Sequence, residues 1–301
     1  MAVITTGTNP KTLWPGLNAI WGRDYQENDQ EWRDLFDVET SDQAYEEDLE
    51  VTGFGLAPKK PEGQPLAYDT ETQGVVKRYT HVAYALGYVV THEEQKDNLY
   101  KQVAERRTQA LGFGMRQTKE NVAANVYNRG FNSSYVGADG VEMLSTAHPV
   151  IGASQSNELA VAADLSEASL EDLCVQIRQA KNARGLNISL RPMKLIIPSA
   201  RSFDAYRILE SIGQNDTANN AVNALKSRGS IPGIAENVYL SDDDAFFIRT
   251  NAPRGLTMFQ REAADFGQDN DFDTKNLKYG AYERYSVGWT DWRGIYGSPG
   301  A

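Results

Sequence analysis

The longest periodic segment of the chain constrains its fold more than any other feature. Between Thr91 and Asn128, apolar residues recur at spacings of four, seven and eight, which keeps them on one face of a helix. These residues are Leu99, Val103, Leu111, Met115, Val122 and Val126. Thr91 and Glu94 have the spacing of a capping box at the start. One continuous helix over this range spans roughly 55 Å, at about 1.5 Å per residue. This length exceeds the width of a small domain. Such a helix needs packing partners along its whole length.

Two other segments alternate with the period of a β-strand. Between Val82 and Val90 the large side chains fall on one face, and Ala83, Ala85 and Gly87 fall on the other. Between Leu277 and Trp289 the alternation is interrupted once, by Glu283. Period-two alternation predicts strands with one face packed on a core.

The middle third of the chain predicts a mixed α/β module. Ser166 is a candidate N-cap for a helix over residues 165–184, with Gly185 as its stop. The other expected elements are a strand at 193–197, a helix at 200–211, a loop at 213–233, and strands at 237–240, 245–249 and 255–260.

Residues 49–90 together predict a long two-stranded excursion from the body. A strand over residues 49–56 changes its apolar face at Gly53, which indicates a bulge or bend. Residues 57–73 then contain three prolines, Lys59 and Lys60, and little that could enter a core. A connection this long inside a compact domain is usually functional.

The net charge of −11 is confined to one segment, because residues 24–50 hold twelve acids and a single base, Arg33. A neutral body with an acidic arm is a poor binder of nucleic acid. Two interpretations of the arm remain open. It is a solvated segment, or it docks on a basic patch of a neighbouring copy, which its aromatic residues Trp32, Phe36 and Tyr45 favour.

Motifs that would indicate catalysis are missing from the sequence. The three histidines have no metal-ligand spacing, and the lone Cys174 falls in a helical pattern where a buried inert thiol is expected. The run Asp242–Asp244 lacks the spacing of a calcium loop, so a turn is expected there. We predict no catalytic, cofactor-binding or metal-binding residue, and keep a metal-dependent enzyme using this run as the weaker alternative. No apolar stretch suits a membrane helix or a secretory signal, so folding in the cytoplasm is expected.

The order of these segments resembles the major capsid proteins of tailed bacteriophages, which have the HK97-like fold. Residues 137–149 resemble the loop after the long helix of these proteins, and residues 279–297 resemble their C-terminal strand. The resemblance implies an α+β, HK97-like capsid fold with an N-terminal arm, an E-loop hairpin, a long spine helix in a peripheral domain, and a mixed α/β axial domain. The implied ranges are 1–48 for the arm, 49–90 for the E-loop, 91–149 for the peripheral domain, 150–262 for the axial domain, and 263–301 for the return strands.

The resemblance also implies a function and partners. The chain would be a head protein that forms pentamers and hexamers of an icosahedral shell around double-stranded DNA, without sequence-specific DNA binding. It would lie in the virion after assembly in the host cytoplasm, with a separate scaffolding protein, a portal and a decoration protein as partners. An encapsulin-like bacterial compartment protein is the alternative with the same fold. The candidate intersubunit contacts are Trp32, Phe36, Tyr45, Lys59, Lys60, Tyr68, Asn219 and Asn220; covalent crosslinking through Lys59 or Lys60 is not predicted.

Overall fold

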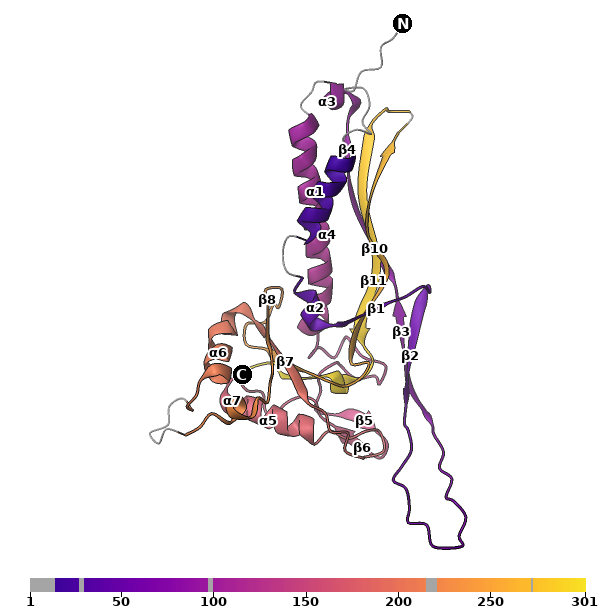
Figure 1. The fold of residues 1–301 in the computed structure, drawn as a ribbon, viewed down its shortest axis with the longest axis vertical. Coiled ribbons are helices and arrows are strands. Elements are labelled where there is room, and N and C mark those ends of the chain that lie inside the picture. The colour runs from indigo at the N-terminus through magenta and orange to yellow at the C-terminus, as the bar shows by residue number, and fades with distance from the viewer. Residues whose placement is uncertain (1–13, 27–29, 97–99, 215–220, 272) are drawn as a thin grey trace.

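A long sheet backed by a helix, a compact α/β module and a projecting hairpin make up the chain (Figure 1). The computed structural model describes all residues except 1–13, 27–29, 97–99, 215–220 and 272. The long sheet and its helix form a tall column, and the α/β module sits at its foot. The hairpin descends beside the module and extends past it. The mixture of helices and strands confirms the predicted α+β class.

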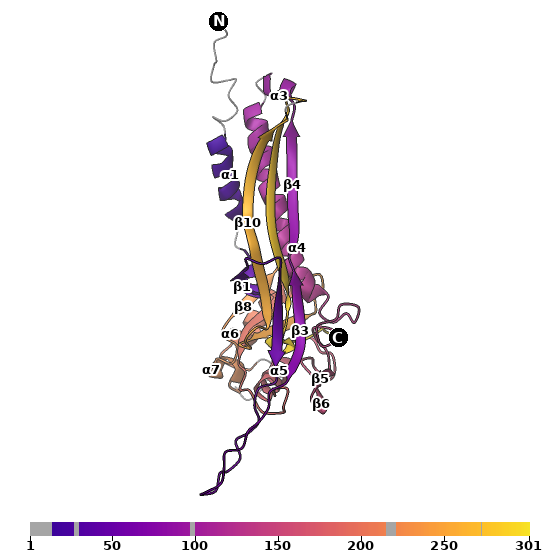
Figure 2. The ribbon, with the colours of Figure 1, turned by 90° about the vertical axis from the view of Figure 1, so that its right-hand side faces the viewer.

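The long sheet has the order β1-β10-β11-β4, with β1 parallel to β10 and the other pairs antiparallel. Its strands are β1 (Asp37–Thr40), β10 (Leu256–Asn270), β11 (Leu277–Trp289) and β4 (Val82–Val90). Helix α4 (Tyr100–Asn128) packs on β4 and β11, and α1 (Trp14–Gln26) lies beside α4 (Figure 2). The predicted facing of β4 is correct, because the Tyr88 hydroxyl reaches Thr108 on α4 at 2.7 Å.

The helical region differs from the expected single helix over 91–128. A short helix α3 (His92–Lys96) comes first, with the backbone N–H of Glu94 donating to Thr91 Oγ1 at 3.3 Å. Helix α4 then begins at Tyr100 and spans about 43 Å at about 1.5 Å per residue. Leu99 lies outside the described residues. The weak helix former Gly114 faces β4, where an added Cβ would lie 3.2 Å from Leu86 Cδ2.

The α/β module is built on a second sheet with the order β12-β9-β7-β8. Helices α5, α6 and α7 share a core with this sheet. The bounds are β7 (Pro192–Pro198), β8 (Ile234–Asn237), β9 (Phe246–Thr250), β12 (Ile295–Ser298), α5 (Glu167–Arg178), η3 (Ser199–Arg201), α6 (Ser202–Glu210), α7 (Ala224–Arg228), η4 (Trp292–Gly294) and the small pair β5 (His148–Val150) and β6 (Ala153–Gln155).

Ser166 caps α5 as predicted, but the helix ends six residues earlier than expected. The chain turns back instead, in a bridge between Lys181 and Asn187 in which Gly185 has a φ of +81°. Helix α7 occupies part of the segment expected to be loop, and β8 lies three residues before its expected start. Strand β10 is much longer than expected because it pairs with β11 as far as Asn270.

Two topological features concern the expected domain division. The expected boundary at residue 262 falls inside β10, and β12 pairs with β9 in the sheet of the α/β module. The chain therefore passes from the module into the long sheet along β10 and returns to the module at β12.

The projecting hairpin consists of β2 (Tyr45–Val51) and β3 (Gln73–Thr80), joined by residues 52–72. The register shifts between Leu49 and Val51, and Gly53 has a φ of +66°, so the bend expected near Gly53 is confirmed. The strand ends before Phe54 and Leu56, which were expected to lie within it. Strand β4 continues directly from β3 and belongs to the long sheet.

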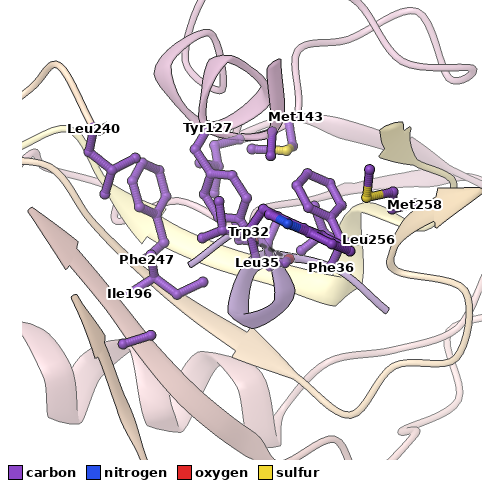
Figure 3. Packing of buried hydrophobic residues seen from close by; sticks show 14 of the residues in the cluster. Trp32, Leu35, Phe36, Tyr127, Met143, Ile196, Leu240, Phe247, Leu256 and Met258 are labelled. Carbon is purple, nitrogen blue, oxygen red and sulfur yellow. Dashed lines mark hydrogen bonds between the residues drawn. The ribbon is translucent and has the colours of Figure 1, made fainter. Parts of the chain in front are cut away.

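The N-terminal segment enters two of the hydrophobic cores. Leu17 and Trp21 of α1 pack with Phe266 and Tyr279 on the long sheet. Trp32, Leu35 and Phe36, from α2 (Trp32–Leu35) and the residue after it, fill the junction between α4 and the two sheets (Figure 3). The Tyr127 hydroxyl donates to the carbonyl of Leu35 at 2.7 Å. The described residues 14–26 and 30–40 are therefore an integral part of the fold, which differs from the extended arm expected there.

The loop after α4 is held to the C-terminal segment by Asn157, which is fully buried. Its side-chain amide donates to the carbonyls of Met143, Trp292 and Ile295, and its Oδ1 accepts from the backbone N–H of Ser145. His148 also reaches Oδ1 at 3.0 Å and stacks on Trp292, so the expected structural role for His148 is supported by its burial.

We predict that Asn157→Ala destabilises the subunit by about 3 kcal/mol or more, because buried backbone carbonyls lose their donor at once. The measurement is the free energy of unfolding from urea denaturation. Asn187→Ala is the control, since the Asn187 side chain is exposed, and it should change stability by less than about 0.5 kcal/mol. Equal stability of the two variants would contradict the assigned role.

Candidate assembly surfaces

The acidic run at residues 24–50 docks on basic residues of its own chain. Asp34 pairs with Lys194 at 2.6 Å, and Asp37 pairs with Arg249 at 2.9 Å, which ties the run to β7 and β9. Further pairs join the run to β10 and to the loops beside it. They are Asp42–Arg261, Asp48–Arg254 and Glu50–Arg293. The cations that these acids contact belong to the same subunit and not to a neighbouring copy, while Glu39 and Asp42 remain exposed to solvent.

Two of the candidate contact residues lie inside the subunit. Trp32 is 3% exposed and Phe36 is 2% exposed, and both pack in the junction core. Their assignment to a neighbouring copy is replaced by this core role, because their rings already contact α4 and the sheets. Tyr45 stays exposed on β2, with the Arg78 guanidinium 4.3 Å from its ring centroid. Asn219 and Asn220 lie outside the described residues.

The tip of the hairpin carries exposed apolar side chains. Tyr68 is 93% exposed and Leu56 is 81% exposed, and Phe54 and Leu66 are more than half exposed. Lys59 and Lys60 are also exposed at this tip. A folded domain rarely leaves such a group of large apolar side chains in water unless another surface covers it.

The tip is tethered to the module at one point. Asp69 pairs with Arg184 at 2.7 Å, and its Oδ2 accepts from the backbone N–H of Gly55 at 2.8 Å. These hydrogen bonds lower the pKa of Asp69, with the N–H of Gly55 as the largest cause. The contact fixes how the hairpin leaves the body and leaves residues 56–68 without a packing partner among the described residues.

The base of the hairpin is fastened by His81, between β3 and β4. Its Nε2 lies 3.0 Å from Ser41 Oγ, and its Nδ1 lies 3.0 Å from Ser286 Oγ. Burial lowers the pKa of His81, with the nearby Arg284 as the next cause. Ser41 in turn donates to Glu46 at 2.5 Å. The ring therefore joins the segment between β1 and β2, which enters the hairpin, to the β3–β4 junction and to β11.

The outer face of the long sheet carries a row of glycines that the sequence patterns did not reveal. Gly87, Gly280 and Gly267 are paired in register across β4, β11 and β10, and they line a shallow groove. Only Gly87 is required by close packing, since its Cβ would lie 2.6 Å from the carbonyl oxygen of Tyr279. The signal was hidden because each glycine lies in a different strand.

A buried group of ionisable residues under the N-terminal segment was also missed. Lys119 on α4 and Glu283 on β11 form an ion pair at 3.3 Å, with side chains 4% and 0% exposed. The available signal was Glu283 itself, which interrupts the apolar alternation of β11. An inward acid in a strand needs a buried partner, and Lys119 continues the apolar helix face four residues after Met115.

The residues that the sequence offers as candidates for metal binding or catalysis have structural roles. Asp242 Oδ1 accepts from the backbone N–H of Asp244, and Asp244 pairs with Arg201, so this run forms the expected turn. Burial raises the pKa of Cys174 to about 11, which keeps the sulfur as a thiol. Within the described part of the chain, no three His, Cys, Asp or Glu side chains gather as a metal site.

None of the helices that the structure describes is both long and apolar enough to cross a bilayer.

Solved structures with the same arrangement of elements come from capsids and virus-like particles. A virus-like particle protein from Pyrococcus furiosus aligns with a TM-score of 0.55 at 12% identity, covering 94% of this chain and 97% of its own. A structure of Mycobacterium phage Patience aligns with a TM-score of 0.55 at 11% identity, covering 99% and 90%. The capsid of the cyanophage P-SCSP1u also gives 0.55, at 10% identity, covering 88% and 86%. At these identities the similarity establishes the fold.

Family membership comes from sequence. No curated protein matches the chain at a significant level. A family model described as phage capsid protein matches residues 74–298, which is well over half of the chain. The match begins within β3 and includes the long sheet, α4 and the α/β module. The chain therefore belongs to the phage capsid protein family, and it shares the fold of solved capsid and virus-like particle proteins.

Proposed function

We propose that copies of this chain assemble into pentamers and hexamers of an icosahedral shell that encloses double-stranded DNA. The observation that carries the proposal is the hairpin tip, where Phe54, Leu56, Leu66 and Tyr68 are exposed on a projecting segment with no core of its own. Burial of apolar surface at about 25 cal/mol per Å² would stabilise the contact of each tip with a neighbouring copy. Many such modest contacts become cooperative when a shell closes.

Each part of the subunit has a proposed role in this shell. The E-loop, at residues 49–90, overlies an adjacent subunit, with Lys59, Lys60 and Tyr68 in the contact and Tyr45 beside its base. Residues 91–149 and 263–301 form the peripheral domain, and residues 150–262 form the axial domain. Asn219 and Asn220 remain predicted contacts near the five- or six-fold axis. The described residues between 14 and 48 stay with their own subunit, as the burial of Leu17, Trp21 and Trp32 and the ion pair of Asp34 support.

The proposed partners are a scaffolding protein, a portal and a decoration protein, with assembly in the host cytoplasm and a final place in the virion. The role is structural and not enzymatic. A net charge of −11 supports a container that holds DNA without specific binding, since phosphate binding needs clustered Lys and Arg.

An encapsulin-like compartment is the second candidate, because the fold is shared with a virus-like particle from Pyrococcus furiosus. The contents of the particle distinguish the two. The phage proposal expects particles that package DNA when portal and packaging proteins are present, whereas a compartment shell would enclose a protein cargo.

Cryo-electron microscopy of the expressed chain, alone and with its scaffolding protein, tests the proposal. Closed shells with pentamers and hexamers are the expected result. Monomers alone, by microscopy and mass photometry under every assembly condition, would overturn it.

A further inference from the structure

The N-terminal segment is attached to α4 and β11 partly through buried ionisable groups. Tyr25 of α1 donates to Glu283 Oε2 at 3.0 Å, and the backbone N–H of Trp32 donates to Glu120 Oε2 at 2.9 Å. Lys119 Nζ lies 4.6 Å from the Trp32 ring centroid. Loosening of residues 14–36 would expose this group to water, and ionisation within the group would affect how tightly the segment is held.

Glu120 is the carboxyl of this group that accepts a hydrogen bond from the backbone of α2. It is 1% exposed, and its second oxygen, Oε1, finds no hydrogen-bond partner among the described residues. Burial raises the pKa of Glu120 from 4.5 to about 7, and the neighbouring carboxylate of Glu31 also raises it. The N–H of Trp32 and the charge of Arg116 oppose this rise.

The other charged neighbours are already engaged. Lys119 Nζ donates to Gln260 at 3.0 Å and pairs with Glu283, so its charge is used on β10 and β11. Arg33 donates to Gln30 at 2.6 Å. The other titratable groups that face the site are Arg116 on α4, Tyr25 on α1, Glu31 and Asp34 at α2, Glu236 and Tyr239 beside Glu31, and Tyr285 on β11. Of this set, the carboxylate of Glu31 disfavours ionisation of Glu120, in addition to burial.

We propose that Glu120 is a pH-sensitive latch that holds residues 14–36 on α4 and weakens when it ionises. The protonated carboxyl keeps its acceptor for the N–H of Trp32 and places no charge in the apolar junction. The ionised carboxylate adds a buried charge next to Glu31. Water can solvate that charge only if α2 moves away from α4, so ionisation favours the released segment.

The direction of the pH effect follows from the pKa of Glu120, which is 4.5 when the group is exposed and about 7 when it is buried. The stabilisation that protonated Glu120 gives to the docked state is fully present below pH 4.5 and is lost as the pH rises to about 7. The segment is therefore bound tightly in mild acid and more loosely in mild alkali. A capsid subunit with this latch would couple the position of its N-terminal segment to pH before and after assembly.

Hydrogen exchange of the unassembled full chain at pH 5.5 and 8.5 tests the latch, after correction for intrinsic exchange rates. We expect the protection of residues 30–36 to fall roughly tenfold to a hundredfold at the higher pH, as a pKa rise of this size implies. Glu120→Gln should abolish most of this change. Glu158→Gln is the matched control, because burial also raises the pKa of Glu158 but the residue lies in the loop after β6. That control should keep the pH dependence of the natural chain.

Two results would overturn the latch. One is equal protection of residues 30–36 at both pH values in the natural chain, and the other is the same pH dependence in Glu120→Gln. If Glu120→Gln does not fold, carboxyl carbon NMR of the natural chain decides instead, and no carboxyl titrating between pH 6 and 8 would refute the proposal. Because these measurements use unassembled protein, their outcome is independent of whether shells form.

Discussion

Deletion of residues 1–48 is expected to abolish folding of the subunit. The deletion removes Leu17, Trp21, Trp32, Leu35 and Phe36 from two cores, and it removes β1 from the edge of the long sheet. At about 2 kcal/mol for each buried side chain, the loss is about 10 kcal/mol, which is comparable to the whole stability of a typical domain. The deletion also leaves Arg249 and Lys194 without their acidic partners.

The expected observation is insoluble protein, or soluble protein without a cooperative thermal transition by calorimetry. Leu35→Ala gives a graded version of the same loss, and we expect it to lower the free energy of unfolding by about 2–5 kcal/mol. A truncated chain that melts cooperatively near the temperature of the full chain would show that the arm is dispensable. The burial of these side chains in two cores is the reason to expect that the fold depends on the segment.

Shortening the hairpin tip is expected to leave folding of the subunit intact and to prevent assembly of the shell. Replacing residues 57–68 by Gly-Ser-Gly keeps the contacts of Asp69 with Gly55 and Arg184, so the hairpin can still close at its tethered end. The deleted residues are exposed and contribute nothing to the cores, so the free energy of unfolding should change by less than about 1 kcal/mol. The proposed contact with the neighbouring copy is lost at every subunit of the shell.

Sedimentation and electron microscopy measure the assembled fraction, which should fall to near zero for the shortened chain. Tyr68→Ser should reduce the assembled fraction in part. Val161→Ser is the control, because Val161 is another highly exposed apolar residue (79%) but lies in the α/β module. Normal shells from the shortened chain would refute the role of the tip, while unfolding of the variant would show that the tip supports the subunit itself.

Sequence periodicity predicted the type and facing of several elements. The alternation of β4 and β11 and the Ser166 cap were correct because neighbouring residues determine them. The end of the long helix at Asn128 was also predicted correctly, whereas its start at Tyr100 and the end of α5 at Arg178 were not. The long extension of β10 depends on pairing with β11, which local patterns do not show.

The candidate contacts divide in the same way. The exposure of Tyr68 followed from a proline-rich segment with no apolar period. The burial of Trp32 did not, because an aromatic residue in an acidic run is equally consistent with docking within the chain or between chains. Its location is decided by the junction between α4 and the two sheets, which forms only in the folded chain.

The sequence by itself determined that the chain has an amphipathic long helix, alternating strands, a coreless excursion and a single acidic segment. Only the tertiary structure decided where that acidic segment binds. Its partners lie far along the chain, with Lys194 separated from Asp34 by 160 residues and Arg254 from Asp48 by 206. Charge patterns show that an acidic run needs cations, but they do not show which cations the fold brings near. The same holds for Glu283, an anomaly in its strand that only the position of Lys119 on α4 explains.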